Sequence, residues 1–523
     1  MLELVFFGCA FCCGLVVSQF RLPPLIGFLA AGFILHSLGY QSTAALEHAS
    51  ALGVTLLLFS IGLKLQLKSL TKLYVWAPAS LHIMLCTVIF SALMLLLGRF
   101  SLPLFTDLSL ETSMLIGFSF SFSSTVFAVK VLEQRGEMAS FHAKLSIGIL
   151  VMQDIFAVIF LAVSTGKTPN IWAFALLIVL PLIRPLLFKI LDRSKHGELL
   201  PLFGFFFALL AGYQLFEFAG LKGDLGALII GMLFAPHKKA GELAKSLLSF
   251  KDIMLVGFFL TIGLNAELST EVVFTAMLLV ALLPLKMLLY YFFTASFRLR
   301  ARTSLLNAFT LANYSEFGLI VCALAATNGW LSSQWLAVMG IAVSITFIIA
   351  SPLNAHSNQI YVRFEGWLEK FETKQRLSLE QQVPLQGAKI LIFGMGRVGA
   401  GAYETLEQHF PGEVTGVDVS QESIDRHCKR GRTVILADAT DPDFWQRINH
   451  SKVQMVMLAM PKHIQNVLAL EQLKASGFKG SVSAIANYPD QQKELQELGV
   501  GSTYNFYLEA GRGFAEHVNE KIS

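Results

Sequence analysis

The feature that most constrains this chain is a series of long apolar segments that ends near residue 357. A membrane span needs about 20 mostly apolar residues, and thirteen such segments are predicted, the ninth and tenth being short. They lie near residues 2–18, 22–39, 49–66, 73–98, 108–132, 141–165, 170–190, 199–219, 223–236, 248–264, 271–297, 303–328 and 333–353. Only 15% of the residues are charged, against about 25% in ordinary soluble proteins. We therefore expect a polytopic α-helical membrane domain.

Basic residues indicate which connections face the cytoplasm. Alternate connections carry 17 Lys and Arg residues on one side and 3 on the other. The basic side holds Arg21, Lys64, Lys68, Lys72, Lys130, Arg135, Lys144, Lys189, Arg193, Lys195, Lys238, Lys239, Lys245, Lys251, Arg298, Arg300 and Arg302, and the other side holds Arg99, Lys167 and Lys222. With thirteen crossings, this bias predicts an N-terminus outside and a cytoplasmic chain after the last span.

The character of the sequence changes near residue 358, where charged residues and alternating strand and helix patterns begin. We predict a membrane domain over 1–357, a mixed-charge linker over 358–384 and a Rossmann-type α/β domain over 385–523. The net charge of +4 is small and the basic residues form no patch, so we do not expect nucleic-acid binding. Most of the six cysteines lie in apolar runs, and we expect no disulfide framework.

One carboxylate, Asp154, lies within the apolar stretch GILVMQDIFAVIFLAV at 148–163, next to Gln153. A charge at the middle of a span costs at least about 2.5–3.5 kcal/mol, so such residues usually face a cavity and have a function. A carboxylate that binds either a dehydrated cation or a proton, but not both at once, is sufficient for exchange of one against the other. We predict that Asp154 is that group.

Two polar runs interrupt apolar spans, Ser123, Ser124 and Thr125 in the fifth and Asn313–Ser315 in the twelfth. Such side chains compete with helical hydrogen bonding, so both runs are candidate unwound crossings that expose carbonyls and helix ends. Secondary transporters bind ions at breaks of this kind. The alternative for the serines and the threonine is close packing of two helices.

Two further ionisable residues lie in apolar runs, Lys286 in the eleventh span and Glu316 in the twelfth. The fifth and twelfth spans carry the candidate breaks, and the sixth and eleventh carry Asp154 and Lys286. This pairing suggests two inverted halves with broken helices. Burial disfavours an unpaired ammonium, so we expect Lys286 to pair with Asp154 or a nearby acid when no cation is bound. The alternatives are a Lys286 that reaches the membrane interface and a Glu316 that is a structural acid.

The soluble part begins with AKILIFGMGRVGAGAYETL, a strand followed by Gly394-x-Gly396-x-x-Gly399 and a helix. A second strand ends at Asp418, 24 positions after Gly394, near the spacing at which an acid binds ribose hydroxyls. Further strands follow in TVILADAT, VQMVMLA, SVSAIAN and STYNFY. The glycines allow backbone to approach a phosphate at a helix N-terminus, and Arg397 is a candidate phosphate contact. The alternative is an empty domain used for dimer contacts.

Seven stretches resemble, in sequence order, the monovalent cation:proton antiporters, and within them the Kef-type potassium efflux systems. They are LPPLIGFLAAGFIL, GVTLLLFSIGLKLQLKSL, SFSSTVFAVKVLEQRG, MQDIFAVIFLA, LKGDLGALIIGMLFA, FKDIMLVGFFLTIGL and NYSEFGLIV. In that family a Gln-Asp pair is the ion and proton site, and Gln153 and Asp154 match it. Asp-Asp or Asn-Asp pairs often mark sodium exchangers, so the resemblance favours potassium, with a Na⁺/H⁺ antiporter of the same fold as the alternative.

The resemblance also implies a homodimer in the bacterial inner membrane, with a core that moves like an elevator. Asp438 and Ala439 in ADAT resemble the GDAT element of potassium-transport regulatory domains of the RCK/TrkA-N type, which lines the adenosine side of the pocket. Such domains bind AMP or NAD(H), and the sequence does not choose between them. We expect the bound nucleotide to regulate transport.

Two departures from the family pattern stand out. Lys64 replaces the acid of the usual GLEL after the third span. Residues 235–252, APHKKAGELAKSLLSFKD, are basic where glutathione-gated members carry an acidic, histidine-containing segment. The basic segment argues against gating by glutathione.

These features predict a secondary transporter that exchanges K⁺ for H⁺ and is regulated by a nucleotide. A nucleotide-gated K⁺ channel is the second possibility, but the chain has no TVGYG-like filter, which K⁺ channels build from backbone carbonyls. A membrane-tethered oxidoreductase would need a substrate domain for which we find no room. We therefore expect no enzymatic activity and no metal site other than that for the transported cation.

Overall fold

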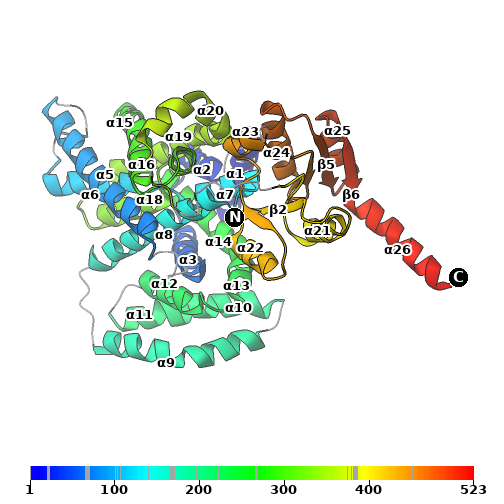
Figure 1. The fold of residues 1–523 in the computed structure, drawn as a ribbon. Coiled ribbons are helices and arrows are strands. Elements are labelled where there is room, and N and C mark those ends of the chain that lie inside the picture. Colours follow the sequence, from blue (N-terminus) through cyan, green and yellow to red (C-terminus); the bar gives the residue numbers. More distant parts are fainter. Residues whose placement is uncertain are drawn as a thin grey trace. The chain divides into compact units, whose positions relative to one another are not determined.

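The computed structural model divides the chain into two compact units (Figure 1). The first comprises Met1–Ala128, Ser146–Phe297 and Ala308–Ala355, and the second comprises Val129–Leu145, Arg298–Asn307 and His356–Ser523. The structure describes residues 2–19, 24–64, 71–100, 102, 104–106, 108–138, 140–164, 171–194, 197–220, 223–265, 269–373, 375–377, 380, 387–448 and 451–522. Predictions for Arg21, Lys68, Lys167, Lys195 and Lys222, and for linker residues 374, 378, 379 and 381–384, lie outside the described residues.

The first unit is built from helices, three of which (α7, α8 and α17) continue into the second unit along the chain. The helices are α1 Leu2–Gln19, α2 Leu25–Ser37, α3 Ala44–Lys64, α5 Leu73–Arg99, α6 Leu110–Ser121, α7 Thr125–Arg135, α8 Phe141–Ser164, α9 Ile171–Arg193, α10 Leu199–Phe205, the π-helix η1 Phe206–Gln214, α11 Leu215–Phe218, α12 Gly223–Phe234, α13 Ala240–Ser246, α14 Leu248–Leu264, α15 Thr270–Val280, α16 Leu283–Ser296, α17 Ala301–Thr310, α18 Glu316–Thr327 and α19 Ser333–Ala355.

Six helical segments of the described chain are long and apolar enough to cross a membrane. They are 44–63, 73–99, 110–135, 199–218, 270–296 and 333–355, with a seventh if α13 and α14, bent by 48°, form one span. Three shorter apolar helices lie at 3–19, 25–37 and 316–327. The predicted polytopic helical architecture is therefore confirmed, whereas the number of thirteen spans stays a prediction.

Apolar side chains cover much of the outer surface of these helices. Val163, Leu4 and Leu182 are 77%, 75% and 71% exposed, which suits a surface in contact with lipid. Inside the unit, α3 and α12 approach so closely that a Cβ on Gly62 or on Gly231 would collide with the backbone of the other helix. Small residues that allow such approach are typical of helix packing in membranes.

The second unit contains a six-stranded parallel sheet with the strand order β3-β2-β1-β4-β5-β6. The strands are β1 Ile390–Phe393, β2 Val414–Asp418, β3 Val434–Leu436, β4 Met455–Leu458, β5 Ser481–Ala486 and β6 Ser502–Asn505. The helices are α20 Ser357–Leu368, the 3₁₀ helix η2 Glu369–Phe371, α21 Arg397–His409, α22 Gln421–Cys428, α23 Pro442–Ile448, α24 His463–Ala475, α25 Pro489–Glu497 and α26 Phe506–Ile522. This order is that of a doubly wound Rossmann fold, whose ligands bind beyond the carboxyl ends of the strands where the order reverses, here between β1 and β4.

Both faces of the sheet are covered, because successive side chains of a strand point to opposite faces. Leu391 and Phe393 of β1 belong to a core that includes Trp445 of α23 and residues of α24 and α25. Ile390 and Ile392 belong to a second core with residues of α21 and α22. A strand buried on both sides reads as a continuous apolar run, as ILIF does here.

Trp445 links one core to the loop after β3. Its side chain is fully buried, its Nε1–H donates to the Ala439 carbonyl at 2.7 Å, and its ring centroid lies 4.8 Å from that of Phe393. We expect Trp445→Ala to lower the free energy of unfolding of the second unit by about 3–5 kcal/mol, because large core truncations leave a cavity. Pulse proteolysis in urea on the full chain in detergent measures it. Trp367→Ala, whose ring is 49% exposed on α20, is the control, and equal losses would contradict this account.

Candidate functional site

The two predicted helix interruptions are present in the first unit. Residues 122–124 separate α6 from α7, and residues 311–315 separate α17 from α18. Ser124 and Ser315 each accept, at 3.1 Å, a hydrogen bond from a backbone N–H of the helix that follows. Serine hydroxyls that cap a new helix offer the backbone an alternative to helix continuation.

The two interruptions are bonded to each other. The Ser124 N–H donates to Asn313 Oδ1 at 2.6 Å, and the Ser123 hydroxyl donates to the Leu311 carbonyl at 2.8 Å. Ser123, Ser124 and Asn313 supply polar side chains to this buried crossing, and Leu311 supplies its backbone carbonyl. The bonds pair backbone groups that helix ends leave without intrahelical partners.

Gln153 connects α8 to the first interruption. Its Oε1 accepts from the Ser123 N–H at 3.0 Å, and its Nε2 donates to the Tyr290 hydroxyl at 2.5 Å. The Ser123 and Tyr290 hydroxyls lie 3.0 Å apart. Both ends of the Gln153 amide are therefore engaged, and the side chain holds the interruption in place.

Asp154 follows on the same helix and is 2% exposed. It accepts a hydrogen bond from the Thr125 hydroxyl at 3.2 Å. Thr125 is the first residue of α7, whose positive helix-dipole end favours a nearby negative charge. An ionised carboxylate in such a place requires a compensating charge or a proton.

Glu316 is the first residue of α18 and is also buried. The Ser124 side chain and the Val126 backbone hydrogen-bond to its carboxylate. The carboxylate is close enough to Asp154 for the two negative charges to act on each other. The structure therefore groups two acids around the start of α7.

The structure corrects the prediction for Lys286. Its Nζ donates to the Phe122 carbonyl at 2.5 Å, to the Asn313 carbonyl at 2.8 Å and to the Phe120 carbonyl at 3.3 Å, and not to Asp154. The side chain is fully buried, so the alternative in which it reaches the membrane interface is also wrong. The last carbonyls of a helix carry partial negative charge, and this ammonium neutralises them at both interruptions.

Two residues at this crossing were missed by the sequence analysis. Tyr290 lies one helical turn after Lys286 on α16, and the His82 ring stacks on the Tyr290 ring with centroids 3.6 Å apart. Both are buried. Aromatic residues in apolar runs look like ordinary core, but the spacing of four residues from Lys286 places Tyr290 on the same helix face.

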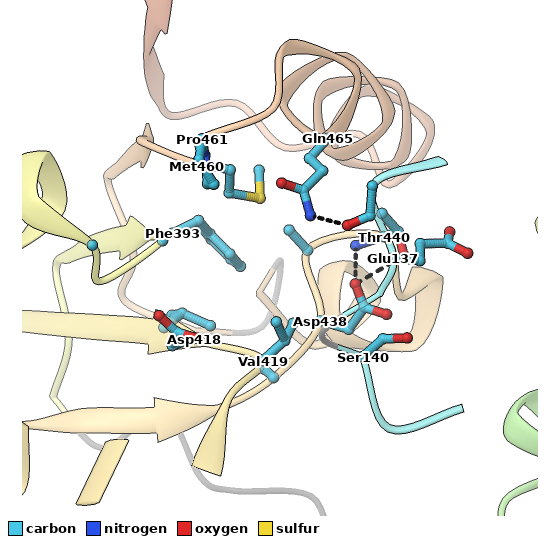
Figure 2. A pocket seen from close by; sticks show the side chains of 16 residues that line it. Glu137, Ser140, Phe393, Asp418, Val419, Asp438, Thr440, Met460, Pro461 and Gln465 are labelled. Atoms are coloured by element: carbon cyan, nitrogen blue, oxygen red, sulfur yellow. Dashed lines mark hydrogen bonds between the residues drawn. The ribbon is translucent and has the colours of Figure 1, made fainter. Parts of the chain in front are cut away.

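A second candidate site lies in the second unit, where a cavity of about 200 Å³ opens beyond the sheet (Figure 2). Of the predicted nucleotide residues, five line it: Gly394, Gly396, Asp418, Asp438 and Ala439. The other two lie on α21, with Arg397 exposed at its start and Gly399 buried two residues later. Most of the residues predicted from the sequence to bind a nucleotide therefore line one cavity.

The glycines of the first loop have different roles. Gly394 has φ +89°, and a Cβ there would collide with the Ala459 carbonyl. A Cβ on Gly399 would collide with the Gly394 carbonyl. Gly396 precedes α21, and a Cβ there would meet no protein atom within 4 Å. Open space at a helix N-terminus is where this fold holds a phosphate.

Asp418 and Asp438 stand at the ends of neighbouring strands. The Asp418 carboxylate accepts from the backbone N–H groups of Met395 at 3.1 Å and Ser420 at 2.9 Å. Asp438 Oδ1 accepts from the Thr440 N–H at 2.9 Å and from its hydroxyl at 2.8 Å. Each carboxylate is thus oriented by its own loop beside the cavity.

The opposite wall of the cavity comes from the connection between α7 and α8, which the sequence analysis did not assign to it. Gly136, Glu137 and Ser140 line the cavity, and the Gln465 side chain donates to the Gly136 carbonyl (Figure 2). Lys462 Nζ donates to the Glu133 carbonyl at 2.9 Å. No local sequence signal marks this wall, because it arises from residues more than 300 positions apart.

A buried polar cluster fixes this connection. Glu137 pairs with Arg135 at 2.7 Å and with His142 at 3.2 Å, and the Ser140 hydroxyl lies 3.0 Å from His142 Nδ1. Burial acts to raise the pKa of Glu137, but the hydrogen bond from His142 and the charge of Arg135 outweigh it and lower the pKa to about 2. Glu137 is therefore ionised and paired at neutral pH.

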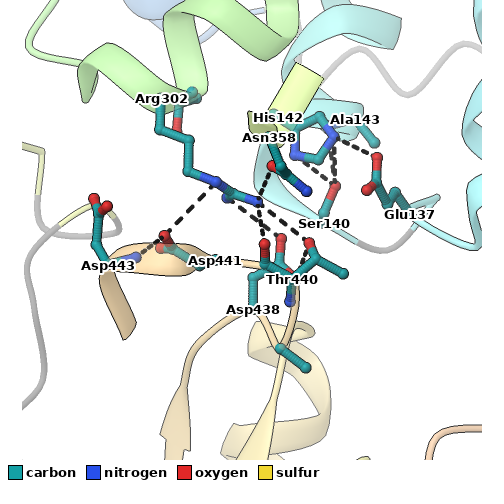
Figure 3. Close-up of polar contacts among 12 residues, drawn as sticks. Glu137, Ser140, His142, Ala143, Arg302, Asn358, Asp438, Thr440, Asp441 and Asp443 are labelled. Carbon is teal, nitrogen blue, oxygen red and sulfur yellow. Dashed lines mark hydrogen bonds and ion pairs between the residues drawn. The ribbon is translucent and has the colours of Figure 1, made fainter. Parts of the chain in front are cut away.

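Two arginines, Arg300 just before α17 and Arg302 within it, bind the loop after β3. Figure 3 shows the contacts of Arg302. Arg300 pairs with Asp441 at 2.7 Å and also with Asp443. Arg302 donates to the Thr440 carbonyl at 3.1 Å and lies 3.6 Å from both Asp438 and Asp441. Burial acts to raise the pKa of Asp441, but the charges of Arg302 and Arg300 outweigh it and lower that pKa.

Helices broken at a polar crossing in an apolar bundle, followed by a doubly wound parallel sheet, define a membrane transporter with a Rossmann-type domain. The family model described as sodium/hydrogen exchanger, transmembrane, matches residues 7–355, and the TrkA-N domain matches residues 390–505. This chain belongs to the sodium/hydrogen exchanger family and carries a TrkA-N domain. The resemblance to Kef-type antiporters is confirmed.

Curated relatives share nearly the whole chain. The glutathione-regulated potassium-efflux system protein KefC of Enterobacter sp. (strain 638) is 25% identical over 539 residues, which cover 97% of this chain and 83% of the relative. KefC of Klebsiella pneumoniae (strain 342) has the same identity and coverage. Among solved structures, the sodium proton antiporter MjNhaP1 from Methanocaldococcus jannaschii aligns over 71% of this chain and 99% of that chain, with 14% identity and a TM-score of 0.48.

The Glu137 cluster generates a pH-dependent prediction. Glu137→Gln should lower the free energy of unfolding of the second unit by roughly 3 kcal/mol near neutral pH, because it removes a buried charge whose pKa is depressed. The folded pKa of about 2 lies below the ordinary glutamate pKa of 4.5. The contribution of Glu137 is therefore complete above the unfolded pKa and is lost as the pH falls toward the folded one.

Pulse proteolysis at several pH values tests this expectation. The difference in unfolding free energy between wild type and Glu137→Gln should be equal at about pH 7 and about pH 5 and smaller below about pH 4. Glu404→Gln, an exposed carboxylate paired with Arg432, is the matched control and should change stability by less than about 1 kcal/mol. A difference that grows on acidification would refute the assignment.

Proposed function

We propose that this protein is a secondary transporter that exchanges potassium ions for protons across the bacterial inner membrane under the control of a nucleotide bound in its TrkA-N domain. The observation that carries the proposal is the placement of Asp154, a buried carboxylate beside two crossing helix interruptions. A buried carboxylate needs either a cation or a proton as its partner. One group that accepts the two in turn couples their movements in opposite directions.

The surrounding residues have distinct roles in this proposal. Asp154 binds the cation or the proton, and the Thr125 hydroxyl that donates to it orients the carboxylate. Gln153 and Ser123 shape the site through the bond between them. Lys286 neutralises the helix ends, which keeps the interruptions stable when no cation is bound. Ser124 and Glu316 form the second acidic position, for which a structural role is the alternative.

Two lines support potassium as the ion. The curated relatives are named as potassium-efflux proteins, and the Gln153-Asp154 pair resembles the potassium-linked branch of the antiporters. The description of the matching family, sodium/hydrogen exchanger, keeps sodium as the alternative ion. The names of the relatives also mention glutathione. We do not extend that regulation to this chain, because residues 235–252 are basic.

The cavity of the second unit is proposed to bind AMP or NAD(H). In this arrangement Gly396 and Arg397 face the phosphate, Asp418 binds ribose hydroxyls, and Asp438 and Ala439 contact the adenosine. Gly394 and Gly399 keep the loop and α21 close to the sheet. The ligand is a regulator, and we propose no enzymatic activity, in keeping with relatives that are transport proteins.

The proposed organisation places the N-terminus outside the cell and the TrkA-N domain in the cytoplasm, where nucleotides are available. The membrane domain is 1–357, the linker 358–384 and the regulatory domain 385–523. We further propose that the protein works as a homodimer.

Proton flux in proteoliposomes with an internal pH dye tests the exchange. Adding potassium should restore the dye signal, and Asp154→Asn should reduce the rate to that of protein-free vesicles, because asparagine keeps the shape but cannot bind a proton. The control is Asp252→Asn, the same change at a carboxylate that is 54% exposed, which should keep the rate within about twofold.

Other outcomes of this assay are equally informative. Recovery driven by sodium instead of potassium would overturn the ion assignment while leaving an antiporter. Potassium flux without proton movement would indicate a channel. Full activity in Asp154→Asn would refute the site.

The nucleotide pocket is tested by Gly396→Ser in the full-length protein. A Cβ at this position meets no protein atom within 4 Å, but the new side chain occupies the proposed phosphate position, so affinity should fall at least about tenfold while folding is kept. Calorimetry with AMP and with NADH measures it. Gly401→Ser, also in open space but further along α21, should bind like wild type, and unchanged binding by Gly396→Ser would disprove the pocket.

A further inference from the structure

The nucleotide cavity has walls that do not belong to the Rossmann fold. Gly136, Glu137 and Ser140, in the connection between α7 and α8, line the cavity together with Asp438 and other residues of the strand ends. All of these residues lie within the second unit. A ligand in this cavity would therefore touch the connection that joins, along the chain, the two helices α7 and α8, which carry Thr125 and Asp154.

A second connection contacts residues that line the same cavity. Arg302, near the start of α17, donates to both the carbonyl and the hydroxyl of Thr440 and to Asn358 Oδ1 at 3.1–3.2 Å (Figure 3). Thr440 and Asp438 line the cavity. Arg302 is 4% exposed and does not itself line the cavity. It therefore contacts residues of the cavity wall and would not contact the ligand.

Asp438 is the residue where ligand and arginine meet. Its Oδ1 is occupied by Thr440, whereas its buried Oδ2 has no hydrogen-bond partner in the described structure and faces Arg302 at 3.6 Å. The Asp438 side chain is 20% exposed and lines the cavity. A ligand that contacts this side chain would change the surroundings of the same carboxylate that attracts Arg302, so occupancy changes the strength of the Arg302 contact.

The residues that line or contact the cavity are continuous in sequence with the helices of the ion site. Ser140 immediately precedes α8, on which Asp154 lies 14 residues, or about 20 Å along a helix, further on. Thr125 begins α7, which ends at the start of the same connection. Arg302 is the second residue of α17, which ends at Thr310 where the second interruption begins. Of the three helices that contain or border the ion site, α7 and α8 thus end and start next to residues that line the cavity, and α17 starts at a residue that contacts the cavity wall.

We infer that the Arg302–Asp438–Thr440 contact and the Gly136–Ser140 connection together transmit nucleotide occupancy to α17 and to α7 and α8. This inference rests on the proposed function and adds the route of regulation and the residues that carry it. The nucleotide regulates transport because it binds the transporter states with different affinity. Arg302 is a positioning residue, because it acts through the pocket wall.

The test combines flux with amide hydrogen exchange on the full-length protein in nanodiscs, with AMP and NADH as probes. In wild type, the bound nucleotide should change the potassium-driven proton flux at least about fivefold, the lower range of allosteric coupling, and should alter exchange in residues 133–145 and 300–310. Arg302→Gln should still bind nucleotide, with affinity within about threefold of wild type. Its flux should respond less than about twofold to nucleotide, and its exchange in 300–310 should not change.

Arg298→Gln is the matched control, since Arg298 lies in the same connection with an exposed side chain and should respond like wild type. Because removal of a buried arginine can unfold a protein, Arg302→Lys provides a second variant that keeps the charge but not the planar fork. It should bind nucleotide and show a reduced response.

The outcomes separate this inference from the proposed function. Wild type that binds neither AMP nor NADH, or that exchanges no ions, would remove the proposed function itself. Wild type that binds nucleotide without altered exchange in 133–145 and 300–310 would overturn the route alone. A full nucleotide response in Arg302→Gln or Arg302→Lys would likewise overturn the role of Arg302.

Discussion

The bonds of the Lys286 ammonium to backbone carbonyls at both helix interruptions are the interaction on which the membrane part depends. Hydrocarbon offers no water to an unpaired carbonyl, so an interrupted helix is tolerated only where protein groups satisfy it. Lys286 neutralises the negative helix ends, while Gln153 and Asn313 occupy the free N–H groups of Ser123 and Ser124. Asp154 can then remain beside the crossing without serving as the partner of the lysine.

The second unit also contains buried cationic side chains, and there they pair with carboxylates. Arg300 and Arg302 are buried among Asp438, Asp441 and Asp443, where charges need close partners. Asp438 and Asp441 belong to the loop after β3, and Asp438 lines the cavity of the second unit. Arg300 and Arg302 hold that loop in place, and the cavity itself is lined by residues of the Rossmann fold and of the connection between α7 and α8.

Several parts of this arrangement were predictable from local sequence. The interruptions at 122–124 and 311–315 follow from runs of hydroxyl and amide side chains inside apolar segments, and the sheet follows from strand patterns around the glycine loop. Predicting the partners of Lys286 failed, because an apolar run with one lysine shows only that a partner is needed. A carboxylate seemed the natural choice, whereas the partners are carbonyls 27 to 166 residues away.

The sequence by itself determined that the chain forms an apolar helical bundle with two broken helices, a carboxylate within a span, and a Rossmann-type domain with a glycine loop. These properties depend on the periodicity and chemistry of neighbouring residues. Only the tertiary structure decided that Lys286 binds helix ends, that Tyr290 and His82 stack at the crossing, and that Gly136, Glu137 and Ser140 line the cavity of the second unit. Each of these depends on which distant segments meet, and that is set by packing of the whole chain.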